Sequence, residues 1–479
     1  VTLCLQYSHT SDYQFVSGGH YTLRVWELVL STRKLKPAEC MLGTLKRVTQ
    51  CLVIDAADKY VYCGTSTGDL LKVDMQSFLF KVIGPKRGKC QKSTPNLKKG
   101  ISACCIDKHG EVYLGSGDGC VVKLDSEMHV VFEISVDQEA QITTCSLASA
   151  TQLLVASNKS NIYTMDITGK TPIVKTLATW HYTQINDVVF PKDSSLLFAT
   201  CSNTDIRIWG TQTNTEYMRI SEGQSCQAKC ILFNGSGSSL ISGWSDCRIR
   251  AYGPQSGRLQ YEIVDAHKHG VTALAVFNEQ SKSEYQIISG GEDGEIRVWT
   301  VSQAKQSLAY SMKEHKGIIT SVCVKRNGLE CVTSCSDGSC IIWDLVRYVR
   351  NAVLFAPSFF KQVCYYPVDE SQLVTVGTDR KVAYWDCYDG SLIREISVNH
   401  CDLVNGLDLT NQFFVLGGSE CLVQVYAYEA GGLMYVGKGH STEILKLRLS
   451  PDQKTIVSVS KDGAIFQWQC PTFNEKLLV

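Results

Sequence analysis

Short runs in which apolar and polar residues alternate recur along the whole chain and predict β-strands. Ile206 and Ile208 alternate with Arg207 and Trp209, and residues 296–299 repeat this pattern. A period of two places successive side chains on opposite faces of a strand. No long stretch has the period of an amphipathic helix, so the pattern predicts an all-β protein.

The strand-like runs belong to a longer repeat. Aligned on its Trp position, the repeat has eleven ends that lie 41 to 51 residues apart. The ends are Trp26, Val73, Leu124, Met165, Trp209, Tyr252, Trp299, Trp343, Trp385, Tyr426 and Trp468. A spacing of about 40–45 residues is typical of the WD repeat, in which four strands make one blade of a β-propeller.

Four of the repeats share a set of polar positions. An Asp lies six residues before the Trp, and a hydroxyl residue lies four residues before that Asp. The sets are Ser289, Asp293 and Trp299; Thr333, Asp337 and Trp343; Thr375, Asp379 and Trp385; and Ser458, Asp462 and Trp468. A His stands upstream in three of them, at His267, His315 and His440. A buried carboxylate needs donors, so we expect His, hydroxyl, Asp and Trp to form one hydrogen-bonded chain.

The same residue types would also suit a catalytic triad. An active site occurs once in a chain, whereas this set recurs in several repeats. We therefore interpret the sets as structural, and we expect Asp337→Ala to destabilise one blade without removing any chemistry.

Eleven blades are too many for one propeller, which usually has four to eight. The last seven repeats predict a complete seven-bladed WD40 propeller in residues 171–479. The first four predict a partial propeller in residues 1–170, with four blades present of seven. At about 44 residues per blade, roughly 130 further residues would precede Val1. A strand-like run at residues 172–178 follows the boundary, and the sequence leaves open which propeller it closes.

Composition adds few constraints. The chain has 47 basic and 47 acidic residues, so its charge indicates neither a nucleic-acid nor a membrane partner. The 22 Cys form no C-x-x-C pair and fall largely in strand-like runs, as reduced thiols do in cytoplasmic proteins. Phosphate-loop, zinc-protease and lipase motifs are missing from the sequence. We expect no enzyme activity, no metal or other cofactor and no small-molecule substrate.

One segment departs from this neutrality. Residues 81–100 carry seven basic residues and no acidic one. The segment could dock on an acidic protein surface or a polyanion, or it could be a solvated loop. Aromatic residues are missing between the basic ones, which disfavours a channel for single-stranded nucleic acid. The candidate partner-binding residues are Lys86, Arg87, Lys89, Lys92, Lys98 and Lys99.

Several longer stretches resemble the cilia- and flagella-associated protein 52 family, a set of WD-repeat proteins of motile cilia. They include SGGHYTLRVWEL at 17–28, CIIWDLVRYVRN at 340–351 and GTDRKVAYWDCYDGSLIREI at 377–396. The resemblance implies a structural microtubule inner protein of the axoneme of a cilium or flagellum, within the cytoplasmic cytoskeleton. It implies two propellers in the lumen of the B-tubule of doublet microtubules, bound to tubulin and to neighbouring inner proteins.

Another class of function also fits a propeller. A soluble WD-repeat adaptor, such as a ubiquitin-ligase substrate receptor or a trafficking scaffold, would have the same fold. Adaptors often carry an additional helical or linear docking module, and none is evident in this sequence. Retention on isolated axonemes under salt extraction would separate the two hypotheses.

Overall fold

The computed structural model describes residues 1–86, 96–138, 140–169, 171–223, 226–281, 284–302, 305–398 and 402–471. Within these ranges every regular element is a β-strand, which confirms the all-β prediction. The described residues contain no helix long and apolar enough to cross a membrane. The strands form eleven antiparallel sheets, ten with four strands and one with three. Each of the eleven repeat ends lies on the third strand of one sheet.

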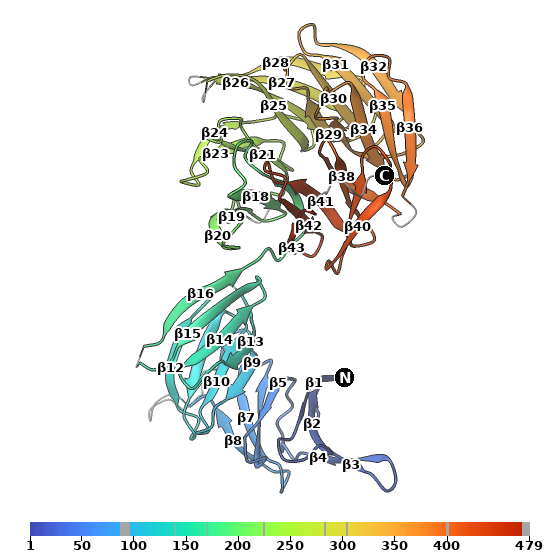
Figure 1. Cartoon of the computed structure of the whole chain (residues 1–479). Helices are drawn as coiled ribbons and strands as arrows, with labels where there is room; N and C mark the ends of the chain where they lie inside the picture. The colour runs from blue at the N-terminus through green and yellow to red at the C-terminus, as the bar shows by residue number, and fades with distance from the viewer. Residues whose placement is uncertain are drawn as a thin grey trace. The chain divides into compact units, whose positions relative to one another are not determined.

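The chain divides into two compact units, Val1–Trp180 and His181–Val479 (Figure 1). The first unit contains four sheets. Their strands, four to a sheet in chain order, are β1 (Thr2–Tyr7), β2 (Gln14–Gly19), β3 (Leu23–Val29), β4 (Lys34–Glu39), β5 (Thr49–Ile54), β6 (Tyr60–Thr65), β7 (Leu70–Asp74), β8 (Phe80–Gly84), β9 (Ile101–Ile106), β10 (Val112–Ser116), β11 (Cys120–Leu124), β12 (Val130–Ser135), β13 (Ile142–Leu147), β14 (Gln152–Ser157), β15 (Asn161–Asp166) and β16 (Ile173–Thr179).

The second unit contains seven sheets, of which the last has three described strands. Their strands are β17 (Ile185–Val189), β18 (Leu197–Ser202), β19 (Ile206–Gly210), β20 (Glu216–Ile220), β21 (Ala228–Phe233), β22 (Leu240–Trp244), β23 (Ile249–Tyr252), β24 (Leu259–Ile263), β25 (Val271–Ser281), β26 (Glu284–Gly291), β27 (Glu295–Val301), β28 (Gln306–Lys313), β29 (Ile319–Val324), β30 (Glu330–Cys335), β31 (Ser339–Asp344), β32 (Val349–Phe355), β33 (Phe360–Tyr365), β34 (Gln372–Gly377), β35 (Lys381–Asp386), β36 (Leu392–Ser397), β37 (Val404–Leu409), β38 (Phe413–Gly418), β39 (Leu422–Ala427), β40 (Leu433–Lys438), β41 (Ile444–Leu449), β42 (Thr455–Ser460) and β43 (Ile465–Gln469).

The strand β16 settles a point that the sequence left open. It pairs with β15, from Asn161 opposite Thr179 to Asp166 opposite Ile173, and so completes the last sheet of the first unit. The compact units accordingly divide after Trp180 rather than at the expected boundary after residue 170.

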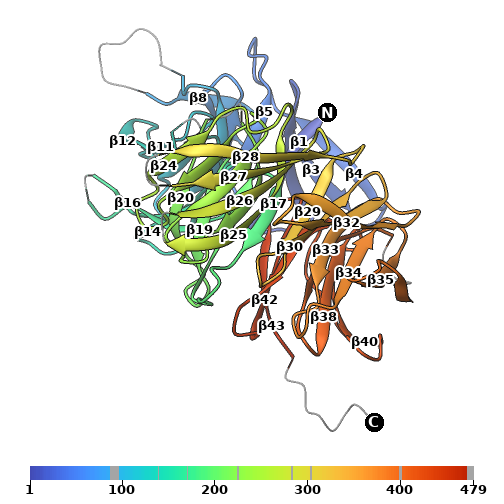
Figure 2. The ribbon, with the colours of Figure 1, turned by 90° about the horizontal axis from the view of Figure 1, so that it is seen from above.

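Burial follows the order of strands within a sheet. Apart from β14, the second strands are almost entirely buried, as in β22 and β38, because apolar residues occupy both of their faces. The fourth strands alternate or are largely exposed, as in β4 and β36, which suits the outer edge of a sheet. Figure 2 shows two sheets from another side, with β26, β27 and β28 side by side and β33, β34 and β35 side by side.

Apolar clusters join each sheet to the next. In the first unit three clusters link the four sheets in chain order. In the second unit six clusters link the seven sheets in the same way. A further cluster joins the last sheet to the first, where Val457 and Val459 pack with Ile185, Phe198 and Trp209. The sheets of this unit follow one another around a circle in Figure 1, and β17 of the first sheet lies against β41 and β42 of the last.

Polar contacts and a glycine also act at the junction between the last and first sheets of the second unit. The Gln467 side chain donates to Asn214 Oδ1 at 2.8 Å, and the Asp452 backbone N–H donates to Ser195 Oγ at 3.1 Å. Gly463 has a φ of +88°, and a Cβ atom there would lie 2.5 Å from the carbonyl oxygen of His181. The turn must therefore be glycine for the two sheets to approach this closely.

Candidate functional site

The sheet β25–β28 joins all four polar residues expected of it. The Trp299 indole N–H donates to Ser289 Oγ at 2.9 Å, and His267 Nε2 lies 2.8 Å from the same hydroxyl. His267 Nδ1 lies 3.2 Å from Asp293 Oδ1. The connection before β25 supplies the His, β26 the hydroxyl, the β26–β27 turn the Asp and β27 the Trp. The chain of bonds thus ties together the inner connection and the two middle strands of one sheet.

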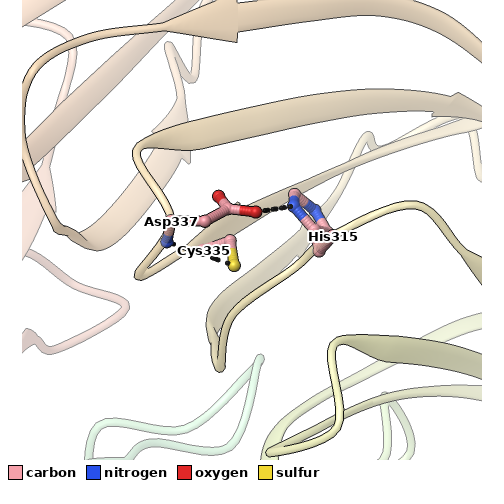
Figure 3. A group of neighbouring side chains, drawn as sticks. All are labelled: His315, Cys335 and Asp337. Atoms are coloured by element: carbon pink, nitrogen blue, oxygen red, sulfur yellow. Dashed lines mark hydrogen bonds and ion pairs between the residues drawn. The ribbon is translucent and has the colours of Figure 1, made fainter.

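The next sheet, β29–β32, inserts a second hydroxyl into this chain. Thr333 Oγ1 lies 2.8 Å from both His315 Nε2 and Trp343 Nε1. His315 Nδ1 meets Ser339 Oγ at 2.8 Å, and Ser339 Oγ in turn donates to Asp337 Oδ1 at 2.5 Å. The direct separation of His315 Nδ1 from Asp337 Oδ2 is 3.8 Å (Figure 3). The carboxylate therefore reaches the imidazole through a serine.

Cys335 lies beside this pair and raises the question of a metal. Ligand atoms of His315, Cys335 and Asp337 lie within 4.8 Å of one another (Figure 3). Both imidazole nitrogens already meet hydroxyl groups, and burial raises the pKa of the Cys335 thiol to about 11. A thiol must lose its proton to bind a metal, so the arrangement favours a hydrogen-bonded corner over a metal centre.

Two other predicted sets are incomplete. In the last sheet, Ser458 Oγ lies 2.6 Å from His440 Nε2 and 2.8 Å from Trp468 Nε1. Asp462 instead accepts a hydrogen bond of 2.6 Å from Ser441, and His440 Nδ1 has no hydrogen-bond partner within the described ranges. The expected link from His440 to Asp462 is therefore not formed.

The sheet β33–β36 contains a shorter version. The Trp385 indole N–H donates to Thr375 Oγ1 at 2.8 Å. Ser358, on the connection before β33, accepts the backbone N–H of Thr378 at 3.1 Å. Among the described residues no hydrogen bond links Asp379 to Thr375. This sheet has no His on the connection that supplies it elsewhere, so the carboxylate lacks its imidazole donor.

A complete set in the sheet β17–β20 escaped the sequence pattern. His181 Nδ1 lies 2.8 Å from Asp205 Oδ1 and His181 Nε2 lies 2.7 Å from Thr200 Oγ1. The Trp209 indole N–H donates to Thr200 at 2.8 Å. Asp205 stands four residues before Trp209 rather than six, which hid the match. The 28 residues from His181 to Trp209, the same interval as from His315 to Trp343, would have revealed it.

A buried network of ion pairs surrounds this set. The Arg207 side chain is fully buried and forms ion pairs with Asp205 at 2.8 Å and Glu216 at 3.0 Å. Burial alone would raise the pKa of Asp205, but the hydrogen bond from His181 and the charge of Arg207 lower it. Asp205 is therefore a buried carboxylate held ionised by its neighbours.

The imidazoles themselves are held neutral. Burial lowers the pKa of His315 and of His440 to about 4, against the opposing charges of Asp337 and Asp462. Burial also lowers the pKa of His181 and His267. A neutral imidazole donates from one nitrogen and accepts at the other, as a link between a carboxylate and a hydroxyl requires.

The basic segment is only partly described. Arg87, Lys89 and Lys92 lie outside the described residues. Lys86 continues the sheet region, since its backbone N–H donates to the Met128 carbonyl at 2.8 Å. The residues Lys98 and Lys99 are exposed. Their role in binding a partner stays a prediction.

Comparison with known proteins identifies the family of this chain. The WD domain, G-beta repeat family matches residues 173–210, 258–300, 306–344 and 431–469. The cilia- and flagella-associated protein 52 of Homo sapiens is 41% identical over 469 residues, which cover 97% of this chain and 73% of that protein. The proteins of the same name from Bos taurus and Chlamydomonas reinhardtii are each also 41% identical, the latter over 98% of this chain.

The chain belongs to the cilia- and flagella-associated protein 52 family. This confirms the resemblance seen in the sequence, and it covers both compact units. The family and the repeat indicate a structural WD-repeat protein rather than a known class of enzyme. The hydrogen-bonded sets recur in different sheets of this chain, which is typical of structural elements of a repeat.

Proposed function

We propose that this member of the cilia- and flagella-associated protein 52 family is a microtubule inner protein of axonemal doublets. It binds tubulin and neighbouring inner proteins in the lumen of the B-tubule and stabilises the motile cilium or flagellum. The observation that carries the proposal is the identity of 41% over 97% of the chain to proteins named for cilia and flagella. A match of this extent includes both compact units.

We further propose that the seven sheets of the second unit are the blades of one closed propeller. The packing of the last sheet against the first supports this, as do the contacts of Gln467 and Asp452 across that junction. The four sheets of the first unit are then blades of a second propeller. A closed propeller leaves only short edges at its rim, and a closed disc is a stiff body.

A scaffold of this kind acts by position rather than by chemistry. Two discs offer several faces, each of which can bind a different partner. Single contacts can be weak, because a periodic lattice presents many of them together and their combined affinity is much higher. The zero net charge suits a protein packed among neighbours.

The hydrogen-bonded sets serve this role by holding the sheet corners in place. In the sets of His181 and His267 one bonded chain links the connection before the sheet to the second and third strands and to the turn between them. Each hydrogen bond contributes about 1 kcal/mol net to stability, and leaving one buried partner without its bond costs more than that.

The proposal can be tested by fractionating axonemes. An epitope-tagged full-length protein is expressed in ciliated cells, and isolated axonemes are extracted with detergent and then with high salt to remove membrane and dynein. We expect the tagged protein to stay with the doublets, and cryo-electron microscopy to show density for its two units inside the B-tubule. Release into the soluble fraction would favour the adaptor instead.

A further inference from the structure

The inner strands of the second unit share an irregularity that has a chemical consequence. In all seven sheets the first strand shifts register against the second by one residue near its start. Two residues of the inner strand there face one residue of its neighbour, as in a β-bulge, and a bulge turns a side chain in a new direction. The extra residues are Asn186, Lys229, Thr272, Thr320, Lys361, Asn405 and Leu445.

These seven residues meet around one cavity. It has a volume of about 240 Å³, and all seven line it, together with Gln184, Ile318, Ile319 and Lys446. Every inner strand of the unit therefore contributes to the wall. Figure 1 shows β21, β29 and β41 near the middle of the circle of sheets. A group that entered the cavity would be surrounded by the bulge residues.

The charge of the wall is one-sided. Lys229, Lys361 and Lys446 supply three ammonium groups, and no carboxylate is among the lining residues. Within the described ranges neither Lys229 nor Lys361 forms an ion pair. Among the described residues, the hydrogen bond of the Lys446 ammonium is to an amide, Gln362 Oε1, at 3.1 Å.

The nearest carboxylates are satisfied by other donors. Asp187 accepts the backbone N–H groups of Val188 at 3.0 Å and Ile231 at 3.2 Å. Glu443 accepts the side-chain amide of Asn405 at 2.7 Å. Deeper along the inner strands, Asp408 accepts two backbone N–H groups and lies opposite the charge of Arg448.

The pKa of Lys446 reflects its burial and the positive charges near it. Burial lowers the pKa of Lys446; the charge of Asp187 opposes this shift, while the charges of Arg448 and Lys361 add to it. A cation that is partly desolvated and close to other cations gains from a bound anion.

We propose that this cavity binds a compact polyphosphate group, either as a free polyphosphate or as the triphosphate chain of a nucleotide. Lysine is a compact point charge that pairs well with phosphate oxygens. A group with several charges can meet all three ammonium groups at once, whereas one carboxylate of an acidic peptide would neutralise a single lysine. The inference concerns a separate surface and is independent of the ciliary role.

The first unit provides an internal contrast. Its inner strands carry the same register shift at Leu3, Gln50, Ser102 and Thr143. None of these is basic, so the bulge alone brings no anion site. The lysines are what distinguish the second unit.

Calorimetric titration of the full chain at moderate salt tests the proposal, with tripolyphosphate as the first probe, ATP as the second and pentaglutamate as the third. We expect one saturable site for tripolyphosphate. Each lost ammonium should weaken it about fivefold, as an ion pair of about 1 kcal/mol would. The triple variant Lys229→Gln, Lys361→Gln, Lys446→Gln should thus lose about a hundredfold in affinity. Comparable binding of ATP would show that the cavity accepts the triphosphate chain of a nucleotide, and binding of tripolyphosphate alone would identify the free form.

A matched control removes three exposed lysines from outer strands, Lys175→Gln, Lys313→Gln and Lys438→Gln, with the same change in net charge. It should bind within about twofold of the natural chain. If both triple variants weaken equally, if tripolyphosphate shows no saturable site, or if only pentaglutamate binds, the proposal is wrong.

A gain-of-charge variant guards against a variant that fails to fold. Leu445→Lys adds a fourth ammonium group at a bulge position where an apolar side chain lines the cavity. It should tighten tripolyphosphate binding about fivefold. Unchanged or weaker binding in a folded variant would contradict the placement of the site.

Discussion

The two units are built from the same kind of sheet but differ in their buried polar groups. The second unit buries four imidazoles, those of His181, His267, His315 and His440. The first unit has four histidines, and all are exposed. Its Trp26 indole N–H still donates to Ser17 Oγ at 2.7 Å, so the Trp–hydroxyl part of the set remains.

The carboxylates of the first unit find other partners. Asp69 forms an ion pair with Arg47 at 2.7 Å, and Asp137 accepts hydrogen bonds from Ser157 at 2.6 Å and Asn161 at 3.0 Å. Apolar clusters nevertheless join each sheet to the next in both units. Sheet stacking therefore depends on apolar burial, and the histidine sets are an additional restraint on individual corners.

The largest expected effect comes from removing the most enclosed carboxylate. Asp205→Ala would leave the buried Arg207 without its closest partner and His181 without an acceptor. We expect the free energy of local opening to fall by about 3–5 kcal/mol, measured by hydrogen exchange in peptides from β18 and β19. Asp118→Ala in the first unit, which loses chiefly the bond from Ser116, should cost about 1 kcal/mol. Equal effects would remove the distinction between the units.

A second comparison lies within the second unit. Thr333→Val removes the hydroxyl that serves both His315 and Trp343 and leaves two buried groups unpaired. We expect a loss of about 3 kcal/mol, against about 1–2 kcal/mol for Thr375→Val, which strands only the Trp385 indole. Denaturant titration of each variant gives both values. If Thr375→Val costs as much as Thr333→Val, the imidazole adds nothing.

Low pH should weaken the second unit selectively. The folded pKa of His315 is about 4, below the usual value of about 6.5, so the unfolded chain binds more protons. The contribution of this group is present in full above about pH 6.5 and is lost as pH falls towards 4. At pH 5 the loss amounts to about 2 kcal/mol for this histidine. Hydrogen exchange between pH 7 and 5 in peptides from β30 and β31 measures it.

The matching variants sharpen the same prediction. His315→Gln should reduce the pH dependence of these peptides, whereas His129→Gln, at an exposed position of the first unit, should leave it unchanged. A pH dependence that persists in His315→Gln would assign the titration to another group.

The smallest effects concern the turn carboxylates. Although burial opposes it, hydrogen bonds from Ser339 and from the Lys316 backbone N–H lower the pKa of Asp337 to about 2. Asp337→Ala should therefore cost about 1–2 kcal/mol. Asp379→Ala, in the sheet without a His, should cost less than about 0.5 kcal/mol. Thermal unfolding of the pair compares them, and a larger loss for Asp379→Ala would contradict this ranking.

Much of the framework could be predicted from the chain alone. The alternation of apolar residues and the spacing of the Trp positions predicted eleven repeats made of β-strands, and eleven sheets are present. The hydroxyl–Trp contacts also followed, because both residues lie at fixed offsets on two neighbouring strands. The set of His181 was missed because Asp205 stands four residues before Trp209 rather than six.

Local pattern determined the strands, their order and the residues able to form the polar sets, because strand period and repeat length depend on neighbours in sequence. Only the tertiary structure decided which carboxylate reaches its imidazole. Asp293 contacts His267 directly, Asp337 reaches His315 through Ser339, and Asp462 bonds to Ser441 instead of His440. The tertiary structure alone also gathered Lys229, Lys361 and Lys446 around one cavity, since these residues are far apart in the chain and meet only because each lies at the start of an inner strand. Whether two side chains come close enough to form a hydrogen bond, and which distant repeats meet, depends on packing. Local sequence does not encode that packing.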